Sequence, residues 1–427
     1  MKGSWKVYML EELGNHYGGL TNKTKEDFGT GKPYIPYLNI FENGRINPEN
    51  LDLVKILPSE RQNRVKYGDL FFTTSSETPH EVGMTSVLLD DIGEAYLNSF
   101  CFGFRLNNFD DLLPEYASYL FRGKDVRKLI SDLAQGSTRY NLSKSIFFEK
   151  LKFNLPPLPQ QRKIAKILST FDEVIEKTKD AIAKYQSIKQ GMMHDLFTRG
   201  IDIKTGKLRP KQEEAPELYQ ESDLGWIPKE WVVKKLEELT SLVTDGAHFS
   251  PTPQEKGLPI GNVKDMRNST FNYEDCTNIL PEVFELLVRQ NCSPRNGDVL
   301  LSKDGTVGKV IHFKDPNKIV LLSSIAILRV NNLISSNYLA WILRSEYFDK
   351  ALFGLLSGSA LKRITLKDIN KIRVPYSKVI EEQEAIAKRL DLIDSKIDLE
   401  QITLNKHKKI KSGLMQDLLS GNKMVTV

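Results

Sequence analysis

The chain has 427 residues, of which 40% are hydrophobic and 27% charged, and its formal net charge is +5. A chain of this length has room for two or three domains with cores of their own, and its ordinary composition excludes a fibrous or largely disordered protein. The small positive charge favours an anionic partner only weakly, and it neither requires nor excludes nucleic acid.

The spacing of the cysteines and the lack of a long apolar run argue against a disulfide-rich, zinc-binding or membrane-spanning protein. The three cysteines, Cys101, Cys276 and Cys292, show no CxxC spacing, which argues against a disulfide framework and against a zinc site. The first ten residues, MKGSWKVYML, have no sustained apolar run, and no window reaches the roughly 20 apolar residues that a membrane span needs. We therefore expect a cytoplasmic protein without a membrane partner.

Residues 1–155 form the first predicted domain. Three of its stretches return later in altered form: WKVYMLEEL at residues 5–13, YGDLFFT at 67–73 and QGSTRYNLS at 135–143. Their counterparts are WVVKKLEEL at 231–239, NGDVLLS at 296–302 and SGSALKRIT at 357–365. A second domain, at residues 226–377, is therefore expected to share the fold of the first, although most of its residues differ.

A long helix is predicted at residues 156–200. Its apolar residues follow one another at alternating steps of four and three, in a frame that continues through Thr178 and Lys189. This seven-residue period is that of a coiled coil, and a proline-bearing stretch before the helix and a glycine after it mark its ends. The seam residues that we expect on this helix are Ile164, Leu168, Phe171, Ile175 and Ile182.

The same helix occurs a second time, at residues 378–421. Gln383 follows Gln161 by 222 residues, and the 36 residues that begin at each glutamine align without a gap, with fourteen positions identical. Unrelated sequences would match at roughly one position in seventeen. The seam of the second helix is expected at Ile386, Leu390, Ile393, Ile397 and Leu404.

Residues 201–225 carry charge and proline but little periodicity, so we interpret them as a linker. The order domain, helix, linker, domain, helix allows the two helices, each a rod of about 54 Å, to pair with each other in an antiparallel coiled coil with a pseudo-twofold axis. The alternative is that each helix is amphipathic and packs only on its own domain. The shared frame and length of the two helices favour the coiled coil.

Catalytic motifs are absent from the sequence. The six histidines show no metal-ligand spacing, and neither a GxSxG elbow nor a GxGxxG loop between a strand and a helix occurs. DGTVGKV, at residues 304–310, has only two residues between its glycines and a valine after its lysine, so a hairpin turn fits it better than a phosphate-binding loop. A chain of this size without catalytic motifs points to a binding or scaffolding protein.

Two divergent domains that alternate with two matched helices, which begin with PLPQQRKIAKIL and EEQEAIAKRL, resemble the specificity (S) subunit of type I restriction-modification systems. SDLGWIPKEWVVKKLEEL at the start of the second domain, the Gly-Asp pairs at 68–69 and 297–298 and the Gly-Ser pairs at 136–137 and 358–359 are further similar features. The resemblance covers essentially the whole chain. It implies two target-recognition domains of α/β (α+β) fold, separated by two long helices that form an antiparallel coiled coil.

The function that the resemblance implies is recognition of double-stranded DNA without catalysis. Each domain would read one half of a split, asymmetric site, and the helices would fix the spacing and dock two methyltransferase (M) subunits. S-adenosylmethionine would be bound by those subunits, and ATP and Mg²⁺ would serve nuclease-translocase (R) subunits, so this prokaryotic chain would bind no cofactor and no metal. A split site requires a rigid spacer, because a slip of one base pair moves a reader about 3.4 Å along the duplex and rotates it around the axis.

Base edges and phosphates are contacted mostly by Arg, Lys, Asn, Gln and hydroxyl side chains on loops. We therefore expect DNA contacts in the stretches after the Gly-Asp pairs, in the Gly-Ser stretches and in DGAHFSPTP at residues 245–253, with ordinary solvated loops as the alternative. The candidates in the first domain are Thr73, Thr74, Ser75, Ser76, Ser137, Arg139, Tyr140, Asn141 and Lys144. Those in the second domain are His248, Ser250, Ser302, Lys303, Lys309, Ser359, Lys362 and Arg363. The Gly-Asp pairs themselves are expected to form turns.

Two other functions stay open on the sequence alone. The same architecture in an inactive or orphan locus would be a scaffold that holds its partners without reading DNA. An enzyme that acts by itself would need methylation or cleavage motifs, and the sequence contains none. Sequence-selective DNA binding by the complex with M subunits distinguishes the S subunit from the scaffold.

Overall fold

The computed structural model describes residues 5–267, 270–356 and 363–425. The chain forms two compact units, which are Met1–Asp180 with Ile402–Val427 (unit 1) and Ala181–Gln401 (unit 2). Each of the two long helices contributes one stretch to each unit.

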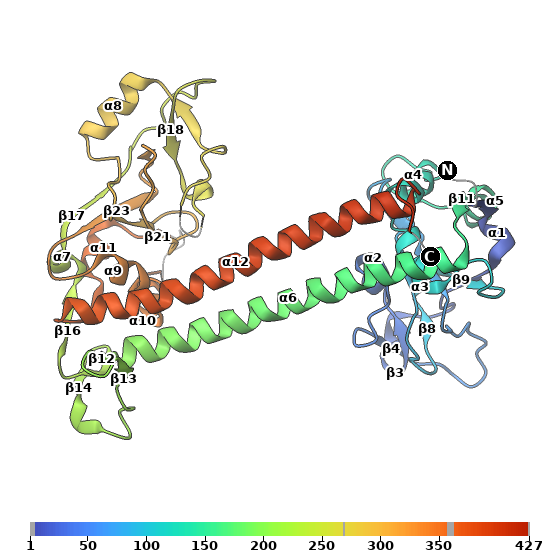
Figure 1. Cartoon of the computed structure of the whole chain (residues 1–427), viewed down its shortest axis with the longest axis horizontal. Helices are drawn as coiled ribbons and strands as arrows, with labels where there is room; N and C mark the ends of the chain where they lie inside the picture. Colours follow the sequence, from blue (N-terminus) through green and yellow to red (C-terminus); the bar gives the residue numbers. More distant parts are fainter. Residues whose placement is uncertain (1–4, 268–269, 357–362, 426–427) are drawn as a thin grey trace. The chain divides into compact units, whose positions relative to one another are not determined.

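Unit 1 is built around an antiparallel sheet with the strand order β2-β9-β5-β7. It is accompanied by the sheet β4-β3-β8, whose strands are labelled in Figure 1, and by the pairs β1-β11 and β6-β10. β5 consists of LFFT, a run of apolar and β-branched residues that suits a strand covered on both faces. Stacked phenylalanine rings, such as Phe72 and Phe102 with centroids 5.3 Å apart, fill the core beneath it. The elements are β1 (Lys6–Met9), α1 (Leu10–Leu13), β2 (Gly14–Gly18), η1 (Lys25–Asp27), β3 (Phe28–Ile35), α2 (Tyr37–Glu42), β4 (Asp52–Val54), β5 (Leu70–Thr73), β6 (Ser75–Ser76), β7 (Thr85–Val87), β8 (Tyr96–Leu97), β9 (Cys101–Leu106), α3 (Pro114–Leu120), α4 (Lys124–Asp132), β10 (Tyr140–Asn141), α5 (Lys144–Lys150) and β11 (Lys152–Leu155).

Unit 2 repeats the two sheets and the β1-β11 pair of unit 1. Its sheet β17-β23-β20-β21 corresponds to β2-β9-β5-β7, its sheet β19-β18-β22 to β4-β3-β8, and its pair β16-β24 to β1-β11. The elements are β12 (Ile201–Asp202), β13 (Lys207–Leu208), η2 (Pro216–Leu218), β14 (Tyr219–Ser222), β15 (Gly225–Pro228), β16 (Trp231–Lys235), α7 (Leu236–Leu239), β17 (Thr240–Asp245), β18 (Leu258–Gly261), η3 (Val263–Asp265), β19 (Thr277–Ile279), α8 (Pro281–Arg289), β20 (Val299–Ser302), β21 (Val310–His312), β22 (Val320–Leu321), β23 (Ile325–Val330), α9 (Ser336–Ile342), α10 (Glu346–Leu356), α11 (Leu366–Lys371) and β24 (Arg373–Ser377).

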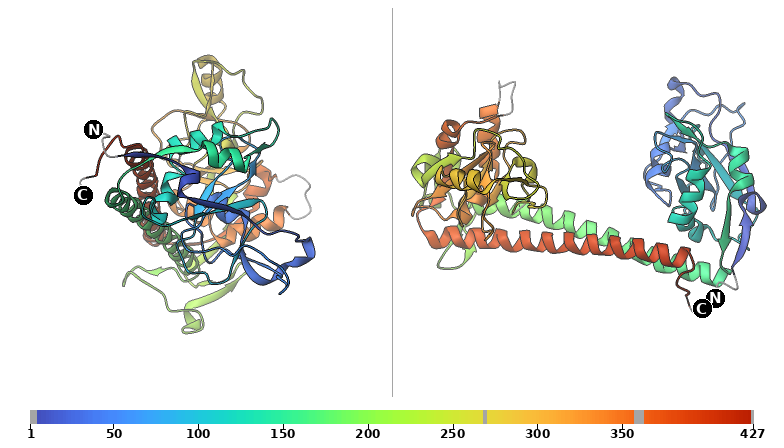
Figure 2. Two further views of the ribbon diagram at one scale, coloured as in Figure 1. Left: turned by 90° about the vertical axis from the view of Figure 1, so that its right-hand side faces the viewer. Right: turned by 90° about the horizontal axis from the view of Figure 1, so that it is seen from above.

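The two long helices are α6 (Leu158–Thr198) and α12 (Ile380–Leu419), and within each unit they lie side by side (Figure 2). In unit 2, Lys189 of α6 forms an ion pair with Asp394 of α12, and Lys396 lies 5.6 Å from the ring centroid of Tyr185, so the two helices run antiparallel. In unit 1 the ion pair of Asp172 with Lys411 is the counterpart of the Lys189–Asp394 pair. Asp172 precedes Asp394 by 222 residues and Lys411 follows Lys189 by 222, so the aspartate now lies on α6 and the lysine on α12. The two helices thus form an antiparallel coiled coil with an internal twofold repeat.

The predicted seam serves two purposes along each helix. Its first two positions, Ile164 and Leu168 on α6 and Ile386 and Leu390 on α12, belong to the hydrophobic cores of unit 1 and unit 2. Farther along, the seam residues Ile175, Ile182 and Leu404 are buried, while Phe171, Ile393 and Ile397 are half-buried. The far ends of the helices are buried in cores as well, Leu196 and Phe197 of α6 in that of unit 2 and Leu418 of α12 in that of unit 1, so each helix is anchored near both of its ends.

A buried glutamine joins the start of each long helix to the domain before it. Gln161 accepts a hydrogen bond from the Leu113 amide (3.0 Å) and donates to the carbonyl oxygens of Asp111 (2.7 Å) and Pro156 (2.9 Å). Gln383 makes the same set, accepting from the Ser335 amide (2.7 Å) and donating to the Leu333 (3.1 Å) and Ser377 (2.8 Å) carbonyls. Both glutamine side chains are fully buried, so their polar atoms depend on these three main-chain groups as partners, and the bonds tie the start of the helix to the domain.

The predicted linker, residues 201–225, is more ordered than its composition suggests. It contains the hairpin β12–β13 and most of the hairpin β14–β15. Arg209, between these hairpins, is buried and pairs with Glu382 in the first turn of α12 and with Glu230 at 2.6 Å. A buried guanidinium with two carboxylate partners fixes this segment to unit 2.

The glutamine bonds predict a local loss of stability in one unit. Replacing Gln383 by Met keeps the volume of the side chain but leaves the Ser335 amide and two carbonyls without partners, which should cost roughly 3 kcal/mol. Native-state hydrogen exchange of the amides in α9 and β24 measures this cost within unit 2. Gln401→Met, at an exposed position of the same helix, is the matched control and should leave these amides unchanged. Equal exchange in both variants would contradict the anchoring role.

Candidate nucleic-acid interface

The two stretches predicted to contact DNA in the first domain lie together in unit 1. β6 pairs with β10, so that Ser76 is opposite Tyr140 and Ser75 is opposite Asn141. The Arg139 guanidinium also donates to the Ser75 hydroxyl oxygen at 3.2 Å. The segment after the Gly-Asp pair and the Gly-Ser segment therefore form one edge of the unit, which we call the unit 1 edge (residues 73–76 and 135–144).

The candidate side chains of the unit 1 edge differ in their exposure. Thr73 is fully buried, where its hydroxyl oxygen accepts from the Met84 amide at 3.0 Å, and Ser75 is also buried. Thr73 and Ser75 therefore support the edge from inside the unit and are not part of its exposed surface. The half-buried candidates are Thr74, Ser76 and Tyr140, and the exposed ones are Ser137, Arg139, Asn141 and Lys144.

The corresponding stretches of the second domain also meet. The amide of Ile364 donates to the Lys303 carbonyl at 2.9 Å, and Asp304 and Arg363 face each other as an isolated β-bridge. Lys303 in turn forms an ion pair with Asp245 at the end of β17, at 3.1 Å. These segments form the unit 2 edge (residues 245–250, 302–309 and 363–364).

The candidates in unit 2 are again of two kinds. Ser302 and Lys303 are buried, and the Ser302 hydroxyl donates to the Thr306 carbonyl at 2.6 Å. Lys303 is therefore an internal ion-pair residue beneath the edge, although the sequence predicts it as a DNA contact. The exposed candidates are His248, Ser250, Lys309 and Arg363, while Ser359 and Lys362 lie outside the described residues.

The Gly-Asp pairs form the turns that support both edges. Gly68 and Gly297 have φ angles of +83° and +91°, which glycine adopts without strain. The aspartates that follow are buried and form ion pairs with an arginine of the neighbouring strand, Asp69 with Arg105 at 2.6 Å and Asp298 with Arg329 at 2.7 Å. Each edge therefore continues from a strand whose beginning is held by a charge-assisted bond.

In unit 1 a tyrosine joins this support. The Tyr17 hydroxyl donates to Asp69 at 2.5 Å, and its pKa is raised far above the ordinary value by burial and by the negative charge of Asp69. Tyr17 therefore stays protonated and remains a donor to the carboxylate at any physiological pH.

Two exposed aromatic side chains, one beside the unit 1 edge and one in the unit 2 edge, are not singled out by any pattern in the sequence. Phe100 is 61% exposed, and its carbonyl oxygen accepts from both the amide (3.1 Å) and the hydroxyl (2.8 Å) of Thr74. Phe249 is 49% exposed and follows His248 in the unit 2 edge. Exposed rings beside hydroxyls and cations are typical of nucleic-acid-binding surfaces, where they stack on bases or contact sugars.

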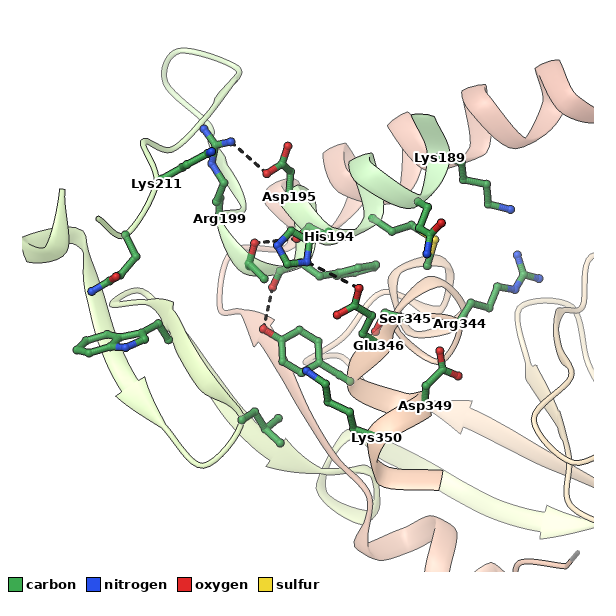
Figure 3. Close-up of a pocket in the computed structure, with 18 of the residues that line it drawn as sticks. Lys189, His194, Asp195, Arg199, Lys211, Arg344, Ser345, Glu346, Asp349 and Lys350 are labelled. Carbon is green, nitrogen blue, oxygen red and sulfur yellow. Dashed lines mark hydrogen bonds and ion pairs between the residues drawn. The ribbon is translucent and has the colours of Figure 1, made fainter. Parts of the chain in front are cut away.

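A groove of about 740 Å³ runs along the helices in unit 2, lined by α6, α12, the predicted linker and α10 (Figure 3). Lys189 and Arg344 lie on one side of it, and both cations also lie within 4.9 Å of the Trp341 ring centroid. Unit 1 contains a groove of about 450 Å³ whose lining includes Arg122 and Lys411, the counterparts of Arg344 and Lys189 at the 222-residue offset. The repeat therefore creates equivalent hollows in both units.

The described residues offer neither a metal centre nor a membrane span. No group of three or more His, Cys, Asp or Glu side chains converges there in the way that a metal ion would require. None of the helices in the described part of the chain is both long enough and apolar enough to span a bilayer.

The sequence profile of the type I restriction modification DNA specificity domain matches this chain twice, at residues 2–184 and 228–409. The chain belongs to the family of type I restriction-modification specificity subunits. The two matches correspond to the two structural repeats, and they identify the chain as the DNA-recognition component of such a system.

Individual members of the specificity-subunit family agree with this assignment. The chain is 26% identical over 425 residues to the type I restriction enzyme MjaX specificity subunit of Methanocaldococcus jannaschii, with 98% of this chain and 93% of that protein covered. It is 30% identical over 318 residues to the MjaVIII specificity subunit of the same organism, with 71% of this chain and 69% of that protein covered.

Solved structures of the family share the fold. The type I restriction-modification S subunit from M. genitalium superposes with a TM-score of 0.57 at 16% identity, over 99% of this chain and 96% of its own. A chain from a study of complex assembly and conformational transition in a type I R-M system gives 0.56 at 18% identity, over 97% of both chains. The expected fold of two α+β recognition domains, separated by the helices of an antiparallel coiled coil, is confirmed.

The support beneath the unit 1 edge leads to a prediction. Asp69→Asn removes the negative charge that pairs with Arg105 and leaves the Tyr17 hydroxyl with a weaker acceptor, so unit 1 should lose roughly 2–4 kcal/mol of stability. Hydrogen exchange of the amides in β5 and β9 measures this loss. Asp110→Asn, at an exposed position of the same unit, is the control. Unchanged exchange in Asp69→Asn would show that the turn does not depend on the ion pair.

Proposed function

We propose that each unit reads one half of a bipartite, asymmetric DNA site through its edge, and that the two long helices set the spacing between the halves. The observation that carries this proposal is that both edges are built on the same main-chain frame but present different side chains. The amide of Thr74 donates to the Phe100 carbonyl and its carbonyl accepts from the Leu142 amide, and Lys303 makes the same two bonds with Ser324 and Ile364. A shared frame with different side chains is what two readers of different sequences require.

The helices suit the role of spacer because each is anchored to a domain in two ways, by apolar packing and by hydrogen bonds. One end of each apolar stripe lies in the core of a domain, and a buried glutamine fixes the start of the helix to that domain. A continuous helix rises 1.5 Å per residue, so its length is set by residue count and does not vary as that of a flexible linker does.

We further propose that the helices and the two equivalent grooves dock two M subunits. Two hollows lined by counterparts at the 222-residue offset suit two copies of one partner. In this proposal the chain itself is not catalytic and works in the prokaryotic cytoplasm. S-adenosylmethionine is bound by the M subunits, and ATP and Mg²⁺ are used by R subunits that join for restriction.

The proposal is tested by co-expressing the chain with the M subunit encoded beside it and mapping N6-methyladenine by long-read sequencing. The expected result is one split motif with two defined halves and a constant gap. A stable complex that leaves the genome unmethylated would contradict the proposal and favour a scaffold that does not read DNA. The M subunit expressed alone is the control for methylation that does not depend on this chain.

One cation of the unit 1 edge allows a second prediction. Lys144 is exposed at the start of α5, where we expect it to contact a phosphate. Lys144→Ala should therefore weaken binding of the complex to cognate and unrelated duplexes by a similar factor, and should lower the slope of log K against log salt by about 1. Lys150→Ala, at the exposed end of the same helix, should change neither quantity. A loss confined to cognate DNA would show that Lys144 reads a base instead.

A further inference from the structure

The unit 2 edge contains a buried ion pair that the unit 1 edge lacks. The side chain of Lys303 is 3% exposed and that of Asp245 is 8% exposed, and Nζ lies 3.1 Å from Oδ2. Removing two charges from water carries a large desolvation penalty, so such a pair contributes little net stability compared with an apolar pair of the same size. Its presence therefore calls for a role other than stability.

The same position in unit 1 is occupied by uncharged residues. In the strand register, Asp245 pairs with Ala326 as Gly18 pairs with Phe102, and Lys303 follows β20 as Thr74 follows β5. Glycine and threonine thus replace aspartate and lysine on a frame with the same main-chain bonds. The fold does not require the ion pair.

Lys303 joins the parts of the unit 2 edge through three different groups. Its amide donates to the Ser324 carbonyl at 2.9 Å, its carbonyl accepts from the Ile364 amide at 2.9 Å, and its ammonium pairs with Asp245. The backbone beyond Asp245 is also held, because the Ala247 amide donates to the Leu321 carbonyl at 2.7 Å. The segment that carries the next residue, His248, has little freedom to shift.

Asp245 also determines which ring nitrogen of His248 is free to bind an external partner. Its second oxygen, Oδ1, lies 2.9 Å from Nε2 of His248, whose side chain is 71% exposed. Because a carboxylate only accepts, Nε2 carries a proton, and Nδ1 is the nitrogen left for an external partner. In a neutral ring Nδ1 is an acceptor, and the amino groups of adenine and cytosine in the major groove are the donors that it fits.

We propose that His248 is a specificity-determining residue for the half-site that unit 2 reads, and that Asp245 and Lys303 are the positioning residues that orient it. This inference rests on the proposed function, since it requires that unit 2 reads DNA. It assigns different roles to three residues of one edge: His248 contacts a base, while the ion pair below it fixes the ring and the nitrogen that it presents.

The test uses the two halves of the methylated motif as readout and internal control. Three variants of the full chain are co-expressed with the M subunit: His248→Ala, Asp245→Asn, and the double variant Asp245→Asn with Lys303→Met, which removes both buried charges together. Lys318→Met, at an exposed position of the same unit outside the edge, is the matched control. Because His248 is largely exposed, His248→Ala is not expected to impair folding.

The expected result is a relaxed motif in one half only. His248→Ala and the double variant should accept other bases at the same position, with methylation of singly substituted sites rising about tenfold relative to the intact motif. Asp245→Asn should relax that position too, because an amide no longer fixes the protonated nitrogen. The other half and the control should keep the wild-type motif.

Two different failures can be told apart. If the wild-type chain gives no split motif, the proposed function fails and the inference fails with it. If the wild-type motif is present and every variant keeps both halves unchanged, the inference alone is overturned, even where the overall level of methylation falls. A uniform fall with an intact motif would show that the ion pair only supports folding.

Discussion

The arrangement of this protein depends on one buried glutamine side chain at the start of each long helix. The fully buried side chains of Gln161 and Gln383 each bond one main-chain amide and two main-chain carbonyls. A carboxamide has donors and an acceptor at fixed angles, so the helix can begin in only one orientation relative to the loop and the strand that it contacts. The direction in which each helix leaves its domain is therefore set by hydrogen bonds, which are directional, and not by apolar packing alone.

The two units share their main-chain frame and differ mainly in the side chains of their edges. Their sheets share strand order and register, and the ion pairs between the helices are reciprocal. The edges share main-chain bonds, yet one has an internal ion pair and the other a glycine and a threonine at the same positions. Side chains can change at such an edge at little cost to the fold, because its hydrogen bonds belong to the backbone.

The sequence predicts the periodic parts of the structure well. The alternating steps of four and three locate both helices, predicted at 156–200 and 378–421 and observed as Leu158–Thr198 and Ile380–Leu419. The motif repeat also predicts that segments after the Gly-Asp pairs and around the Gly-Ser pairs are related in both domains. These inferences succeed because they depend on local periodicity and on comparison of the chain with itself.

What the sequence does not show is which polar residues are buried. Lys303 lies in a hydroxyl- and cation-bearing stretch and is predicted as a DNA contact, but its partner, Asp245, comes from a strand that is distant in the sequence. The same holds for Thr73 and Ser302, whose hydroxyls bond within the fold. Exposure depends on tertiary packing, so the composition of a loop cannot separate the residues that support an edge from those that face outward.

The ion pairs of Arg209 have a consequence for how such chains can exchange parts. Arg209 lies in the segment after α6, and its partner Glu382 lies in the first turn of α12, so the whole second recognition domain is inserted between them. A homologous domain that replaces residues 231–377 as a cassette leaves both ends of this buried contact in the recipient. A cassette that begins before Arg209 and ends before Glu382, in contrast, replaces Arg209 by the donor's residue, and where that residue is uncharged the Glu382 carboxylate is left buried without a partner. The positions of the two residues thus define where genetic exchange can create a new specificity without destabilising the chain.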